Sequence, residues 1–182
     1  MRRPGMVSAA LAPVVLIGGW SLAQARQPAG YNSVRDTISA LAAVHAHDRW
    51  IMTAGLALLG ACHLVTAASM TEARTAGRVL LGSGGIATLV VAAARQPATA
   101  HAPAAAVAFA ALALWPIWSG VPSRRSALTA AAVLAALLAW FSLELGDGAT
   151  LGLSERSVAA AEALWPLTVV AVLTRRAMTR RD

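Results

Sequence analysis

The sequence predicts an all-α integral membrane protein, a single domain over residues 1–182 that crosses the membrane with six transmembrane helices. Hydrophobic residues make up 58% of the chain and charged residues only 13%, whereas soluble domains carry about 25% charged residues. Six apolar stretches are each long enough to cross a hydrocarbon core of about 30 Å as a helix that rises about 1.5 Å per residue. All 15 basic residues are arginines, and they gather in alternate loops. A net charge of +7 therefore indicates membrane topology and gives no reason to expect a nucleic-acid partner.

The predicted spans, in order, cover residues 6–24, 48–69, 79–94, 101–119, 127–145 and 156–174. The first stretch also resembles a signal peptide that ends at Ala23-Gln24-Ala25. We expect a retained span instead, because the stretch is long for a signal peptide and its removal would leave an odd number of spans. Residues 146–155 are glycine-rich, and we expect them to form a loop.

The arginines predict the orientation. One set of termini and loops holds ten of them, and the opposite set holds Arg26, Arg35, Arg49, Arg95 and Arg156. The positive-inside rule therefore predicts that both termini are cytoplasmic. Six of the eight carboxylates fall at the other, outer end: Asp36, Asp48, Glu144, Asp147, Glu155 and Glu162.

The segment between the first two spans carries Tyr31, the single tyrosine of the chain. The run from Ser33 to Asp36 is typical of a helix start, and it predicts a short outer helix. Two interpretations stay open for Asp36, with its neighbours Arg35 and Ser39. The carboxylate caps a surface helix, or it points into a dry cavity and serves as a proton donor.

The last span offers a second acidic pair. Glu155 and Glu162 are seven residues apart and share one helical face, and Trp165 follows three residues later. Ser154 and Glu155 also suit a plain helix start. A carboxyl inside a membrane needs a partner, and we expect Arg156, Arg35 or Arg49 to supply it. Glu144 on the fifth span is expected to reach toward water.

The four histidines do not predict a metal site. His45 and His47 lie in a loop beside Asp48, without a further ligand fixed in space. His101 begins the fourth span at the acidic end and can join a site there. His63 is expected to be buried and hydrogen-bonded.

The tryptophans divide into two groups. Trp20 and Trp50 near the outer end, with Trp115 and Trp118 near the inner end, fit an aromatic belt at the membrane surfaces. Trp140 and Trp165 lie deeper, on the spans that carry Glu144 and Glu162. Aromatic faces stabilise positive charge, so these residues beside a carboxylic acid suit chemistry through a carbocation, and they also suit packing.

Motifs for other chemistry are absent from the sequence. It contains no aspartate-rich motif for Mg²⁺ and diphosphate, no phosphate-binding loop, no Gly-x-Ser-x-Gly and no His-Glu-x-x-His. We therefore expect no cofactor.

Short pieces along nearly the whole chain resemble domain-of-unknown-function family 998, a group of small bacterial integral membrane proteins. They are Asp36-Thr-Ile-Ser39-Ala-Leu41, Gly55, Gly60, Pro97, His101, Phe109, Gly152-Leu-Ser-Glu-Arg156 and Trp165. The family usually has an aromatic residue where this chain has Gln96. The resemblance implies a six-helix fold in the bacterial inner membrane and supplies no activity.

These observations favour an intramembrane enzyme that cyclises an apolar, isoprenoid-like substrate after protonating it. Small bacterial membrane terpene cyclases are similar in outline. The expected acid is Asp36 or Glu155, with Ser39, His101, Arg156 and Glu162 around it, and Tyr31, Trp50, Trp140 and Trp165 against the substrate. A transporter or channel subunit and a non-enzymatic assembly partner are the alternatives. Gly82-Ser-Gly-Gly85 allows close helix contacts, and contacts of this kind can also build a homo-oligomer.

Overall fold

Six long helices and one short helix form the part of the chain that the computed structural model describes, residues 3–146 and 148–179. The elements are α1 (Arg3–Gln24), α2 (Ile38–Leu41), α3 (Trp50–Ser69), α4 (Thr75–Ala93), α5 (His101–Ser119), α6 (Arg124–Glu144) and α7 (Leu151–Met178). All except α2 are long and apolar enough to cross a membrane. No strand occurs within those described ranges. The all-α prediction with six spans is therefore confirmed.

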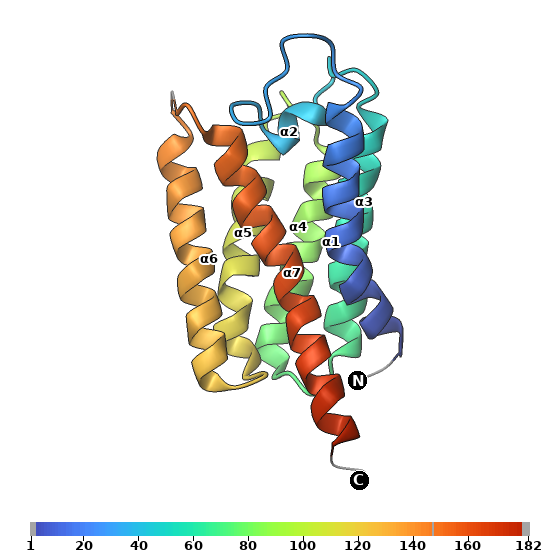
Figure 1. Ribbon diagram of the computed structural model, residues 1–182, viewed down its shortest axis with the longest axis vertical. Helices are drawn as coiled ribbons and strands as arrows, with labels where there is room; N and C mark the ends of the chain where they lie inside the picture. The colour runs from blue at the N-terminus through green and yellow to red at the C-terminus, as the bar shows by residue number, and fades with distance from the viewer. Residues whose placement is uncertain (1–2, 147, 180–182) are drawn as a thin grey trace.

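The helices stand side by side, and the two ends of the bundle differ (Figure 1). The start of α1 and the end of α7 lie at one end, which we call the inner end, and α2 with its flanking loops lies at the outer end. Helices α1, α3, α4 and α5 pack in sequence, while α7 crosses the bundle against α1 and α6. The shared end agrees with an even number of spans. The assignment of this end to the cytoplasm stays a prediction. Some of the charged residues counted along the sequence lie outside the described residues: Arg2, Asp147, Arg180, Arg181 and Asp182.

Two groups of buried side chains hold the bundle together. The group at the outer half includes Leu16, Leu41 and Met52, and the group at the inner half includes Met70 and Trp115. Trp115 is fully buried, so the expectation that it belongs to an interfacial belt is wrong. Helix α5 is oriented so that the Trp115 ring faces the core, whereas Trp118, three residues later, is 55% exposed.

Glycines set the close approach of α3 and α4. A Cβ atom added at Gly60 would lie 2.7 Å from the carbonyl oxygen of Gly85, and one added at Gly85 would lie 2.8 Å from the carbonyl oxygen of Gly60. A Cβ atom at Gly84 would lie 2.7 Å from the side chain of Leu112 on α5. Small residues let helix backbones meet in this way inside membranes. Gly84 and Gly85 therefore serve packing within the chain.

The predicted short outer helix is present as α2, but it begins later than the sequence indicated. The structure has a turn at residues 32–36, and α2 begins only at Ile38 with Thr37 as its cap. The side chain of Asn32 accepts a hydrogen bond from the Val34 amide at 2.9 Å. The backbone carbonyl of Asn32 accepts one from the Asp36 amide at 2.7 Å. An asparagine that bonds nearby backbone in this way favours a turn over a helix.

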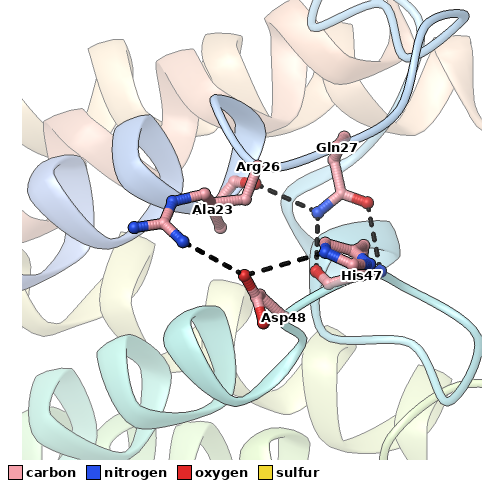
Figure 2. A network of polar contacts seen from close by, with 5 residues as sticks. All are labelled: Ala23, Arg26, Gln27, His47 and Asp48. Atoms are coloured by element: carbon pink, nitrogen blue, oxygen red, sulfur yellow. Dashed lines mark hydrogen bonds and ion pairs between the residues drawn. The ribbon is translucent and has the colours of Figure 1, made fainter.

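A polar network joins the outer ends of α1 and α3 (Figure 2). The Gln27 amide donates to the carbonyls of Ala23 at 3.0 Å and His47 at 2.8 Å. Arg26 lies 3.5 Å from the Asp48 carboxylate, and the His47 ring lies 3.9 Å from the same carboxylate. Arg26 and His47 are exposed, and exposed ion pairs contribute at most about 1 kcal/mol, so this network mainly orients the loop.

We predict that Gly60→Ala destabilises the bundle by about 1–3 kcal/mol, because the added methyl group meets backbone that cannot yield. The matched control is Gly18→Ala on α1, where an added Cβ atom has no heavy atom within 4 Å. Unfolding in dodecyl sulfate, followed by circular dichroism, measures both variants. Equal midpoints for Gly60→Ala and the wild type would contradict the packing described for α3 and α4.

Candidate functional site

Arg156 ties the first turns of α7 to the outer loop. Its Nη1 donates to the carbonyl oxygens of Asp36 at 2.7 Å, Ser33 at 2.9 Å and Gly152 at 2.9 Å. Its Nη2 donates to the hydroxyl of Tyr31. The guanidinium thus satisfies the backbone carbonyls of Ser33 and Asp36, which lie in the loop outside any helix. The charges along the sequence predicted a carboxylate partner for Arg156, and the structure instead gives it these four oxygen acceptors.

Gly152 makes this approach possible. A Cβ atom at that position would lie 2.3 Å from the carbonyl oxygen of Asp36 and 2.8 Å from that of Ser33. The amide of Leu153 also donates to the carbonyl of Val34 at 3.0 Å. The predicted loop at residues 146–155 is therefore shorter than expected: α7 begins at Leu151, and its first turn is the surface on which the outer loop rests.

Glu155 lies next to Arg156 and contacts the start of α2. One carboxylate oxygen accepts the amide of Ile38, and the other accepts the hydroxyl of Ser39 at 3.1 Å. The Ile38 amide belongs to the first turn of a helix and has no partner inside that helix. Glu155, which is only 4% exposed, therefore caps α2 from another part of the chain.

An apolar groove opens beside Glu155 between α5, α6 and α7. This outer groove has a volume of about 380 Å³. Its walls include Phe109, Leu138 and Phe141, and the two phenyl rings are 5.3 Å apart between centroids. Its polar side chains are Thr37, Ser39, Gln96, His101, Ser142 and Glu155. The volume lies within the range of about 300–1,000 Å³ that is typical of small-molecule sites.

His101 supplies a second polar atom to the outer groove. Its Nδ1 lies 2.8 Å from the carbonyl oxygen of Ala94. Because a carbonyl can only accept, Nδ1 carries the hydrogen, and Nε2 is then the acceptor of the neutral ring. That Nε2 is buried and has no hydrogen-bond partner among the described residues.

A smaller central cavity of about 50 Å³ lies deeper in the bundle. It shares Ser39, Ala105, Phe109 and Glu155 with the outer groove, so these residues separate the two spaces. Its other polar side chains are His63, Thr88 and Glu162. Thr88 donates to the carbonyl of Gly84 at 2.8 Å.

His63 is buried, as the sequence predicted. Neither ring nitrogen has a hydrogen-bond partner among the described residues. Glu162 Oε1 likewise has no partner, although an arginine was expected there. Arg49 instead donates to the carbonyl of Val44 at 2.6 Å.

The structure brings Glu155, Ser39 and His101 together at the outer groove. Arg156, beside Glu155, contacts Tyr31, and Glu162 lines the central cavity with Glu155 and Ser39. Asp36, Trp50, Trp140 and Trp165 lie elsewhere. Asp36 lies in the turn, where its carboxylate accepts the amide of Asn32 at 2.7 Å. Trp50 is 66% exposed. Trp140 lines neither the outer groove nor the central cavity, and Trp165 lines a third space between α6 and α7.

Among the residues that line these spaces, His63, Phe109 and Phe141 were missed as site residues. One signal for His63 was available. Leu56, Leu59, Gly60 and His63 recur at helical spacing on α3, and all are buried. Nothing in the sequence indicates that Phe109 and Phe141 meet, because they lie on different helices. Among the described residues, no group of three or more His, Cys, Asp and Glu side chains could hold a metal ion.

Six apolar helices with buried polar groups between them define a multi-pass membrane protein. The family model described as "protein of unknown function (DUF998)" matches residues 9–172. The chain belongs to this family, as its resemblance implied. No curated protein and no solved structure matches it.

We predict that Arg156→Lys loosens the outer loop, because one ammonium group cannot reach carbonyls and a hydroxyl in several directions. Each lost hydrogen bond to a charged group contributes about 1.5–3 kcal/mol, so amide exchange at residues 31–39 should rise by about tenfold or more. Arg35→Lys, at an exposed position of the same loop, is the control. Unchanged exchange in Arg156→Lys would contradict the role of the guanidinium.

Tyr31 gives a pH-dependent test of the same contact. Burial raises the pKa of Tyr31 above its usual value of 10.0, and the neighbouring Arg156 guanidinium offsets part of that rise. The neutral phenol therefore contributes stability that is fully present below pH 10 and is lost as the pH rises through the folded pKa. Since the chain has one tyrosine, tyrosinate absorbance reports it alone. We expect a higher midpoint in the folded protein than in the denatured protein, and equal midpoints would show that Tyr31 is solvated.

Proposed function

We propose that this protein is an intramembrane enzyme that cyclises an apolar, isoprenoid-like substrate after protonating it, with Glu155 as the proton donor. One observation carries the proposal: a buried carboxyl lines an apolar groove that carries two aromatic rings. Of the two acids that the sequence offered, Glu155 lines this groove, whereas the carboxylate of Asp36 is engaged in the outer turn. The donor's role therefore goes to Glu155.

The outer groove suits the substrate. Its apolar walls match a hydrocarbon chain, and its volume of about 380 Å³ falls within the usual range for small-molecule sites. The central cavity, at about 50 Å³, is too small for such a chain. The substrate accordingly lies in the outer groove with its reacting double bond at Glu155.

The groove holds an acid and a base. Ser39 contacts the carboxyl of Glu155, and a serine hydroxyl can rotate so that it accepts from the protonated acid as well as donating to the ionised form. His101 Nε2 has a free lone pair at the same groove. An acid and a base that both reach one substrate are the groups that this reaction requires.

The reaction balances without a co-reactant. The O–H bond of Glu155 breaks as its proton adds to one alkene carbon, and the electron pair of that double bond forms the new C–H bond. A second double bond attacks the resulting cation and closes the ring. A neighbouring carbon then loses a proton to His101 Nε2, which restores a double bond. The proton returns to Glu155, so the product is an isomer of the substrate.

Phe109 and Phe141 are suited to stabilise the cation. Both rings line the groove, and aromatic faces attract positive charge by about 0.5–2 kcal/mol. These two rings take the role that Trp140 and Trp165 were expected to fill. Arg156 acts as a positioning residue, because it holds against α7 the loop that leads into α2, the helix that carries Ser39.

The test incubates purified protein with prenylated compounds of graded chain length and analyses the lipid extract by mass spectrometry. We expect a product of unchanged mass and altered retention. Glu155→Gln should lower its rate by on the order of 100-fold or more, which is the usual contribution of a general acid. Glu144→Gln is the matched control, since Glu144 accepts the amide of Thr150 and does not line the groove. Equal rates in Glu155→Gln and the wild type would refute Glu155 as the donor.

A non-catalytic carrier of an amphiphile is the second candidate. It is favoured by the hydrogen bonds that both oxygens of Glu155 already accept, an arrangement that suits a capping carboxylate. Prenylated compounds that bind in the groove and return unchanged would support this carrier over the enzyme. A transporter or channel subunit would instead show substrate-dependent flux in liposomes.

A further inference from the structure

We propose that Glu162 and His63, bridged by water in the central cavity, form a proton-binding site in the middle of the bundle. The site does not depend on the proposed cyclisation, which uses Glu155 and His101 in the outer groove. Its ligand is one exchangeable proton, carried by the carboxyl, the imidazole and the water between them.

Geometry singles out these two side chains. Glu162 is 2% exposed and His63 is 1% exposed, and both line the central cavity. They belong to helices that lie apart in the sequence, α7 and α3. Glu162 Oε1 and both ring nitrogens of His63 lack a protein partner within the described part of the chain. Buried polar atoms in native proteins nearly always have a hydrogen-bond partner, so the cavity between them has to supply one.

The cavity is large enough for water. Its volume is about 50 Å³, and a water molecule needs about 10–15 Å³ of such space and two to four polar neighbours. The orphaned atoms of Glu162 and His63 provide those neighbours, and the Thr88 hydroxyl lines the same space. One or more bridging waters therefore satisfy atoms that the protein leaves unsatisfied.

The two side chains also complement each other chemically. A neutral imidazole offers one donor and one acceptor, and a protonated carboxyl does the same. An isolated ion buried in an apolar surrounding costs several kcal/mol, so the acid and the base are best satisfied when they share one proton through water. An acid within a membrane span commonly marks a proton path.

Few other ionisable groups face this site. Glu155 on α7 also lines the cavity, and its oxygens accept from Ile38 and Ser39. Helices α1, α2, α4 and α5 contribute apolar residues, Ser39 and Thr88, and none of the lining residues from these four is titratable. Glu155 is therefore the one neighbouring carboxyl among the lining residues that has to be controlled for when the protonation of Glu162 and His63 is measured.

Infrared spectroscopy of the resting protein in lipid vesicles, without any substrate, tests the site. A protonated carboxyl in an apolar surrounding gives a separate C=O band. We expect this band in the wild type, a downward shift in D₂O, and its loss in Glu162→Gln, a nearly isosteric change. His63→Gln should keep the band and shift it, because the water bridge then ends on an amide.

Controls distinguish this site from the other acids. The proposed cyclisation also needs a protonated Glu155, so the band of this site is defined as the one that Glu162→Gln removes. Glu155→Gln and Glu144→Gln should keep that band, and its loss in either variant would assign the proton elsewhere and overturn the proposal. A wild-type protein without the band, or a band that His63→Gln leaves unmoved, would also overturn it. The D₂O shift is measured on the wild type, so this measurement tests the proposal even if a variant does not fold. Failure here leaves the cyclisation untouched, because that is tested by product formation with Glu155→Gln.

Discussion

The structure depends on how the irregular outer loop satisfies its backbone at the edge of the membrane. Backbone carbonyls there need donors that lipid cannot provide. Arg156 supplies them, with hydrogen bonds to the carbonyls of Ser33 and Asp36 at 2.9 and 2.7 Å. Gly152 leaves the space for that approach, since any side chain would collide with the same two carbonyls. One arginine and one glycine on α7 thus fix the position of a loop that lies more than a hundred residues earlier in the sequence.

The groove and the cavity follow from that contact. With the loop held on α7, Ser39 and the start of α2 reach Glu155. Glu155 and Ser39 then stand between the outer groove and the central cavity. The hydrogen bonds that cap α2 also hold a buried carboxyl in the wall of an apolar space. A structural role and a chemical role therefore meet in one side chain, and mutations at Glu155 have to be judged by fold and by product together.

Much of the fold could be predicted because it rests on local patterns. Apolar stretches of sufficient length predicted all six spans, and α5 has the predicted bounds. The site was predicted only in part. Glu155, Ser39 and His101 do meet at one groove, as the sequence suggested by placing them at one end of the bundle. Asp36 could not be assigned, because a turn nucleated by Asn32 directs its carboxylate back to the loop. Trp115 and Trp118 share one short stretch, and only packing decides that the first is buried.

The sequence by itself determined the class of protein, the number of spans and the end of the bundle where the acids gather. These properties follow from apolar length and charge spacing along the chain, which need no knowledge of neighbours. The tertiary structure alone decided which polar groups share a space. His63 and Glu162 lie 99 residues apart in the sequence and line one cavity, and Phe109 meets Phe141 across two helices. Such pairings depend on how each helix is rotated about its axis and on which helices adjoin, and that is set by the packing of the whole bundle.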